Sequence, residues 1–139
     1  MERYRLFDHT ADVGVELFGK GREELFSNAG VALTDIIFGG PGEDKGVVYR
    51  FEVKSPGIEM LLVKYLSELS YIMQVKRLVP ARFTVKFTGE DHLACSVSGE
   101  EFDPSVHGYQ TEVKTVTYHK LTVERRADGS YYARVILDV

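Results

Sequence analysis

The spacing of hydrophobic residues along the chain predicts two helices and several strands. Apolar side chains recur at i, i+3 and i+4 over residues 22–37, and again from Ser55 to about residue 73, as in amphipathic helices. Strands are expected in seven further segments, most of them with alternating apolar and polar residues: 3–7, 13–18, 47–54, 82–87, 93–97, 113–124 and 131–139. We therefore predict an α+β fold, with two amphipathic helices packed on a mostly antiparallel β-sheet, in a single domain over residues 1–139.

Local residues mark several boundaries between these elements. Ser55 and Pro56 predict the N-cap and the first turn of the second helix. Residues 39–46 are too rich in Gly and Pro for a regular element and predict a loop. Asp128-Gly129, between two strand patterns, predicts a hairpin before the last strand.

The charge balance argues against a protein that binds nucleic acid through an obvious basic segment. The chain carries 17 Lys and Arg against 21 Asp and Glu, a formal net charge of −4, and no basic run exceeds a pair such as Arg125-Arg126. Proteins that hold RNA unaided usually present a basic face. An acidic chain with an RNA-related role is expected to act through a protein partner, although scattered residues can still assemble a basic patch in the fold.

Other features restrict the location and the chemistry. The first ten residues lack a secretory signal, and no window has the ~18 apolar residues that a membrane helix needs. With Cys95 as its single cysteine, the chain is expected to be cytoplasmic, and Cys95 is expected in the core. His92 and His107 have no evident partners and are expected on the surface. Signatures of serine hydrolases, P-loops, dinucleotide sites and paired CxxC motifs are missing from the sequence.

The densest group of reactive side chains is the segment Asp8-His9-Thr10-Ala11-Asp12, between the first two strands. Two carboxylates and an imidazole within five positions can bind a cation, serve acid–base chemistry or cap a turn. Asp and Thr satisfy backbone amides well in short turns, so the motif alone favours the turn. Alternation along residues 13–18 places Asp12 and the apolar Val13, Val15 and Leu17 on opposite faces of the sheet.

The last strand ends with a second acidic group. Asp138 lies one residue from the carboxylate of Val139, and like charges this close repel unless a cation or a donor lies between them. If the last strand lies near Asp12, three oxygen-bearing groups converge, which is the kind of site that hard cations such as Ca²⁺ or Mg²⁺ select. The alternative is a frayed chain end that points to solvent.

The segment 112–119 has no clean apolar face. In an extended strand, Lys114, Val116 and Tyr118 would face one way, and Thr115 and His119 the other. Such a strand has a role besides packing in the core, or else it is an edge strand whose lysines prevent unwanted pairing with another strand.

Five segments resemble the archease family, in the same order and spacing from Phe7 to the last residue. Two departures occur: Thr115 stands where the family usually has a small Ala, and Lys64-Tyr65 where many members have Trp. Neither departure lies in the acidic segment. The matching segments are residues 7–14 (FDHTADVG), 23–26 (EELF), 61–69 (LLVKYLSEL), 112–119 (EVKTVTYH) and 133–139 (ARVILDV).

The resemblance implies an accessory protein of the RtcB-type RNA ligase, not an enzyme with catalytic residues of its own. That ligase uses GTP to join a 3′-phosphate or 2′,3′-cyclic-phosphate end to a 5′-hydroxyl in tRNA splicing and RNA repair. Archeases promote its guanylylation and its multiple turnover, so RNA would be reached through the ligase. A metal-dependent phosphoester hydrolase with His9 as the acid–base group, or a chaperone-like binding module, are the alternatives.

The resemblance also implies a divalent metal ion, with Ca²⁺ as the first expectation and Mg²⁺ or Mn²⁺ as alternatives. The expected metal ligands are Asp12, Asp138 and the main-chain carboxylate of Val139. The residues expected around this site or against the ligase are Asp8, His9, Lys114, Tyr118 and His119.

Overall fold

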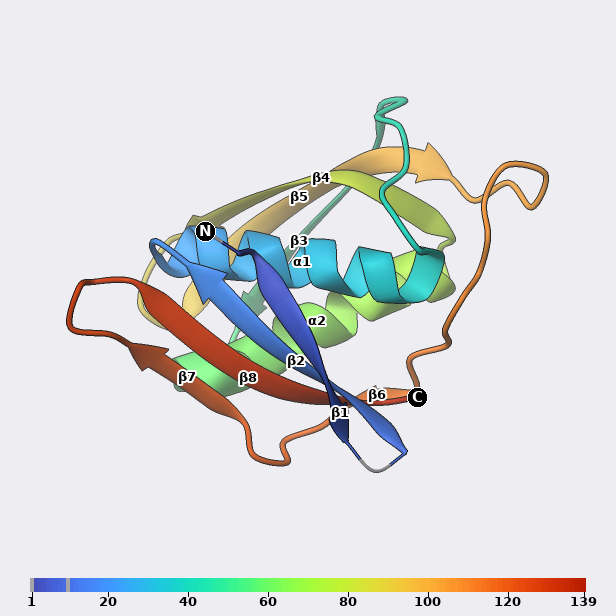
Figure 1. Cartoon of the computed structure of the whole chain (residues 1–139). Helices are drawn as coiled ribbons and strands as arrows, with labels where there is room; N and C mark the ends of the chain where they lie inside the picture. The colour runs from blue at the N-terminus through green and yellow to red at the C-terminus, as the bar shows by residue number, and fades with distance from the viewer. Residues whose placement is uncertain (1, 10) are drawn as a thin grey trace.

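The computed structural model describes residues 2–9 and 11–139, which form two antiparallel sheets with two helices between them (Figure 1). The first sheet has the order β1-β2-β8-β6, and β7 also pairs with β8. Its strands are β1 (Tyr4–His9), β2 (Asp12–Gly19), β6 (Thr115–Val116), β7 (Thr122–Arg125) and β8 (Tyr131–Asp138). The second sheet has the order β3-β5-β4 and consists of β3 (Val47–Lys54), β4 (Leu78–Phe87) and β5 (His92–Glu101). This architecture confirms the predicted α+β fold.

The two helices fill the space between the sheets. Helix α1 (Arg22–Phe38) contacts β2 of one sheet and β4 of the other, and α2 (Ile58–Gln74) also contacts strands of both. Helix α1 is therefore buried on more than one side, including its polar Asn28 and Thr34. Their side chains donate hydrogen bonds to the carbonyl oxygens of Phe18 (2.7 Å) and Gly30 (2.8 Å). Gly39, with a φ of 82°, ends the helix and donates its N–H to Asp35 O.

The predicted cap of the second helix at Ser55 is wrong. Gly57 occupies the N-cap position with a φ of 82°, and no described side chain caps the helix. Ser55 is buried, and its N–H donates to the carbonyl oxygen of Asp91 at 3.0 Å. Ser55 therefore holds the end of β3 against the β4–β5 turn, and the helix begins only at Ile58.

The strand predicted over residues 113–124 is two short strands, β6 and β7. Lys120 between them has a φ of 52°, which an extended strand does not allow, and Leu121 N donates to Tyr118 O across a turn. The predicted alternation also fails, because Val113 and Val116 are buried whereas Thr115 is exposed. The hairpin predicted at Asp128-Gly129 is confirmed, since β7 and β8 pair on either side of it.

The second sheet is longer than its alternation indicated. Strand β4 starts at Leu78, four residues before the predicted segment, because its first residues are all buried and give no period of two. A register shift between Pro80 and Arg82 separates this part from the alternating part. Gly99 of β5 allows the close approach, since a Cβ there would lie 2.1 Å from Val79 O.

The two histidines predicted to lack partners both have one. The His107 side chain is only 10% exposed; its Nε2 lies 3.2 Å from Glu100 Oε2, and its Nδ1 accepts a hydrogen bond from Asp103 N–H. His92 Nε2 lies 2.9 Å from Glu52 Oε1. The expectation of a surface position for His107 is therefore wrong: local sequence gives no sign of contacts that depend on the fold.

Cys95 is a core residue, as predicted. It is 4% exposed beside Tyr65, and burial raises the pKa of its thiol to about 12. Such a thiol is protonated at neutral pH and unsuited to nucleophilic chemistry. Among the described residues, neither helix has the length and apolar character needed to cross a bilayer.

Candidate functional site

The pairing of β2 with β8 places Asp12 directly opposite Asp138. These two residues are the middle of a row of opposed residues across the sheet, because β1 sets His9 opposite Asp12 and β6 sets Thr115 opposite Asp138. Opposed residues of antiparallel strands have Cβ atoms roughly 4.5–5.5 Å apart. Four adjacent strands therefore contribute one residue each to a single row, with the two aspartates in its middle.

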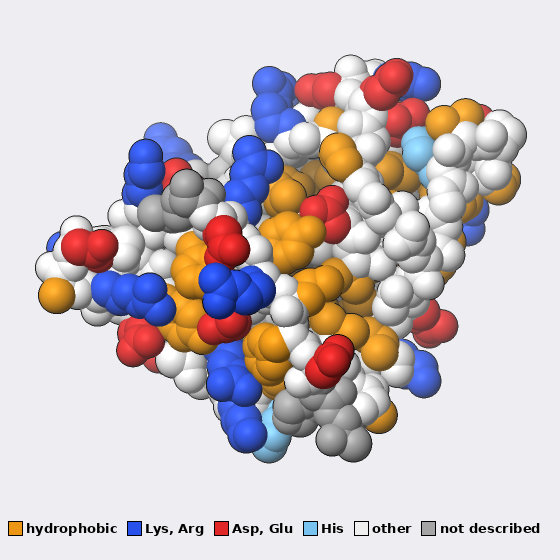
Figure 2. Space-filling view, in the orientation of Figure 1, with side chains coloured by type: hydrophobic (Ala, Val, Ile, Leu, Met, Phe, Trp, Pro, Cys, Tyr) orange, Lys and Arg blue, Asp and Glu red, His pale blue; other side chains and the backbone are white. Residues whose placement is uncertain are grey.

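Both aspartates belong to the outer face of the first sheet. The alternate residues Val15 and Leu17 of β2, and Val135 and Leu137 of β8, are at most 2% exposed in the core. Asp12 and Asp138 are partly exposed on the other face, as the alternation predicted for Asp12. Over β1, β2 and β8 this face mixes acidic, basic and hydrophobic side chains (Figure 2).

The turn between β1 and β2 brings together only part of the predicted group. Asp8 pairs with Val13 and so lies on the face of the hairpin opposite to Asp12. Asp8 and Asp12 both border an open hollow of about 350 Å³. Ala11 turns the chain with a φ of 60°. Thr10 and the side chain of His9 lie outside the described residues.

The segment around β6 is attached to the same end of β8. Lys114 N–H donates to the main-chain oxygen of Asp138 at 2.8 Å, and its side chain is exposed. Tyr118 and His119 lie in the turn that follows β6, both exposed, with Tyr118 at 57%. The His119 N–H donates to Thr117 Oγ1 at 3.3 Å. Lys114 is therefore bonded to the aspartate row through its backbone.

Three residues that support the site were not singled out by sequence reasoning. The Phe7 ring lies against Gly14, where a Cβ would come within 2.2 Å of the ring atoms Cε2 and Cζ. Arg134 stacks its guanidinium carbon 4.6 Å from the centroid of the same ring. Ile136 pairs with Gly14 on the β8 side and is fully buried. Phe7 and Arg134 therefore form a packed wall beside the aspartates, and the glycine in the FDHTADVG segment was the signal for it.

The available donors are oxygen atoms, which fit a hard divalent cation such as Ca²⁺. Among the described residues, no three His, Cys, Asp or Glu side chains gather closely enough to hold a metal ion. A site at this row therefore needs more than Asp12 and Asp138, and Val139, the next residue of the chain, offers main-chain oxygen. Like charges directly opposed in a sheet are destabilising, and a shared cation would remove that cost.

Comparisons with known proteins decide the family. The model of the archease protein family (MTH1598/TM1083) matches residues 4–139. The chain belongs to the archease family. It is 35% identical to the protein archease of Methanosarcina barkeri over 99% of this chain and 97% of that protein. It is also 35% identical to the protein archease of Pyrococcus furiosus, over the full length of both.

A solved archease-like structure supports the fold. The solution structure of protein 1598 of Methanobacterium thermoautotrophicum matches all of this chain and all of that one, with a TM-score of 0.79 and 33% identity. Membership of the archease family supports an accessory role. The Asp12–Asp138 row belongs to the part of the chain that the family model covers.

Proposed function

We propose that this archease activates a GTP-dependent RtcB-type RNA ligase in tRNA splicing and RNA repair. It would promote guanylylation and multiple turnover of the ligase through a metal site at Asp12 and Asp138. The observation that supports this most directly is the register of β2 and β8, which sets these two carboxylates opposite each other. Asp12 and Asp138 come from distant parts of the chain and together form an acidic site at the end of the first sheet.

The residues that would hold the metal are Asp12, Asp138 and a main-chain oxygen of Val139. Ca²⁺ is the first choice, with Mg²⁺ or Mn²⁺ as alternatives, because all these donors are oxygens. A bound cation would supply a fixed positive charge able to orient phosphate groups or ligase side chains. The chain's own part is to keep the carboxylates at one position, through the Phe7–Gly14 contact on one side and the Lys114–Asp138 bond on the other.

The exposed residues around this site supply a surface for the ligase. Tyr118 is a large exposed side chain in the turn after β6, and Lys114 is exposed next to the aspartate row. Aromatic residues are enriched at the energetic centres of protein interfaces. The proposed contact therefore includes Lys114, Tyr118 and His119 from one side, and the β1–β2 turn with Asp8 and His9 from the other.

A ligase assay tests the proposal. A matched ligase is incubated with GTP, metal and RNA ends, and guanylylation and repeated turnover are followed with wild-type protein, Asp12→Asn and Asp138→Asn. Glu90→Gln is the matched control, because Glu90 is exposed in the β4–β5 turn of the other sheet and loses the same charge. We expect both Asp variants to fold normally and to lose most of the stimulation, and the control to keep it. Full stimulation by folded Asp variants, or phosphoester hydrolysis by the purified protein alone, would contradict the proposal.

A further inference from the structure

The outer face of the second sheet gathers positive charge in an otherwise acidic chain. Alternate residues of β3 and β4 point away from the helices, and four of them are cations: Arg50, Lys54, Arg82 and Lys86. Against them stand two carboxylates, Glu52 on the same face and Asp44 at its edge. The face therefore carries a net charge of +2, whereas the chain carries −4.

The two carboxylates are already engaged. Glu52 Oε1 lies 2.9 Å from His92 Nε2, and Asp44 Oδ2 lies 3.4 Å from Arg82 Nη2. Arg50 and Lys86 form no ion pair with any described residue. Their charges are therefore left for an external anion.

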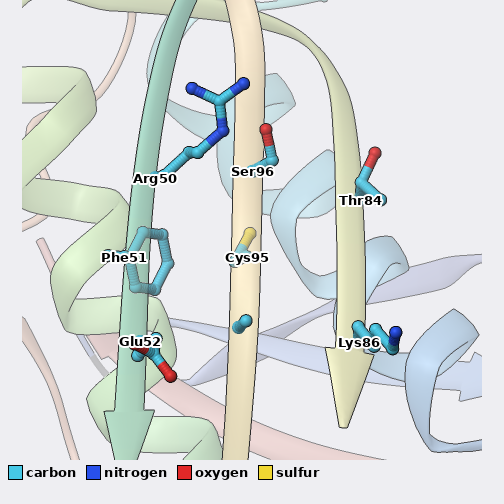
Figure 3. Close-up of a pocket in the computed structure, with 8 residues that line it drawn as sticks. Arg50, Phe51, Glu52, Thr84, Lys86, Cys95 and Ser96 are labelled. Carbon is cyan, nitrogen blue, oxygen red and sulfur yellow. The ribbon is translucent and has the colours of Figure 1, made fainter. Parts of the chain in front are cut away.

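These two cations flank a shallow trough along β5 (Figure 3). Arg50 pairs across Ser96 with Thr84, and Glu52 pairs across Ala94 with Lys86. The central strand thus carries small side chains between longer ones on both sides, which leaves a hollow of about 420 Å³. Its width is two strand spacings, roughly 9–10 Å, which suits one extended chain.

We propose that this trough binds the phosphodiester backbone of a single-stranded nucleic acid. Arg, Lys and hydroxyl side chains are the usual partners of backbone phosphates, and Arg50, Lys86, Ser96 and Thr84 provide all three types. A guanidinium donates two parallel hydrogen bonds to a phosphate. The small side chains of Ala94 and Ser96 form a shallow floor without the pockets that the side chains of an acidic peptide would need, so the trough suits phosphates better.

The same geometry predicts the mode of binding. Apart from His92 at one end of β5, the outward residues of β3, β4 and β5 carry no aromatic ring, so bases would not stack along the trough itself. Binding would then be independent of sequence and sensitive to salt. The face belongs to the second sheet, whereas the Asp12–Asp138 row belongs to the first. This inference is therefore independent of the proposed metal site, and a negative result for one would leave the other unaffected.

The test measures binding of the purified full-length chain to fluorescent single-stranded RNA and DNA oligonucleotides at several salt concentrations. With the two phosphate contacts of Arg50 and Lys86, the slope of log K against log salt is about −1.4, so a fourfold rise in salt weakens binding about 7-fold. Arg50→Ala/Lys86→Ala removes both contacts and should bring the slope close to zero. Both side chains are exposed, and thermal unfolding checks that the variant remains folded.

The matched control is Lys20→Ala/Arg125→Ala, which removes the same charge at exposed positions on β7 and after β2. We expect this control to bind like the wild type. Equal weakening by both double variants would overturn the assignment of the trough, and so would the absence of binding at low salt. Binding of polyglutamate in place of the oligonucleotides would overturn it as well, in favour of an acidic protein partner.

Discussion

The contact between Phe7 and Gly14 makes a quantitative prediction about the wall beside the aspartate row. An alanine Cβ at position 14 would lie 2.2 Å from two ring atoms of Phe7, far inside ordinary van der Waals contact. The ring would have to move by more than about 1 Å and would lose its stacking with Arg134. Overpacking of this kind costs roughly 1–3 kcal/mol.

For a chain of this size, Gly14→Ala should lower the midpoint of thermal unfolding by roughly 4–12 °C. Urea unfolding of wild type, Gly14→Ala, Phe7→Ala and the double variant measures the coupling between the two positions. In the Phe7→Ala background the steric cost vanishes, and Gly14→Ala should then stabilise by about 0.5–1 kcal/mol, because glycine is unfavourable within a strand. A Gly14→Ala variant as stable as the wild type would refute the contact.

Three further predictions concern ionisable groups. Tyr4 donates to Asp35 Oδ2 at 2.6 Å, and burial together with this carboxylate raises the Tyr4 pKa to about 12, so its contribution to stability is complete below pH 10 and lost as the pH rises towards 12. Unfolding curves of Tyr4→Phe should show a smaller loss of stability over that range. Burial raises the Cys95 pKa to about 12, so iodoacetamide at pH 8 should label the unfolded protein and spare the native one. The Glu43 N–H bonded to Glu100 lowers the Glu100 pKa below 4.5, so stability should fall below pH 4.5, and less steeply in Glu100→Gln.

The regular elements were predictable because their signal is local. Helical spacing over residues 22–37 predicted the first helix to within one residue at its end, and the loop predicted from residue 39 begins where the helix ends. Alternation gave β3 with its bounds. Where both sides of a strand are buried, as at Leu78 and Val79, there is no alternation to detect.

Predictions from the sequence were wrong where contacts between residues far apart in the chain override the local conformational preference. Ser55 has the chemistry of an N-cap, but its N–H bonds to Asp91 and the chain turns at Gly57 instead. His107 has no neighbour in sequence that reveals Glu100 as its partner. The left-handed conformation of Lys120 divides β6 from β7, and lysine is not a residue that signals such a turn.

The position of the candidate site was predictable only in part. Asp12 and Asp138 were each singled out as candidate metal ligands, and alternation placed Asp12 on the outer face of its strand; metal binding at these residues stays a prediction. That β2 pairs with β8 at this register depends on sheet topology, which no local pattern determines. The trough along β5 could not be predicted from the sequence for the same reason, since Arg50 and Lys86 flank one hollow only after β3 and β4 are paired with β5.

The most direct test of the account is the stability of wild type and Asp138→Asn with EDTA and with Ca²⁺. If the two aspartates share one cation, Ca²⁺ at 100 times its dissociation constant should stabilise the wild type by about 2.7 kcal/mol, an increase of roughly 10 °C. Asp138→Asn should lose this increase, and in EDTA it should be at least as stable as the wild type, because one of two opposed charges is gone. A wild type that does not respond to Ca²⁺, Mg²⁺ or Mn²⁺, or an Asp138→Asn variant that responds equally, would contradict the account.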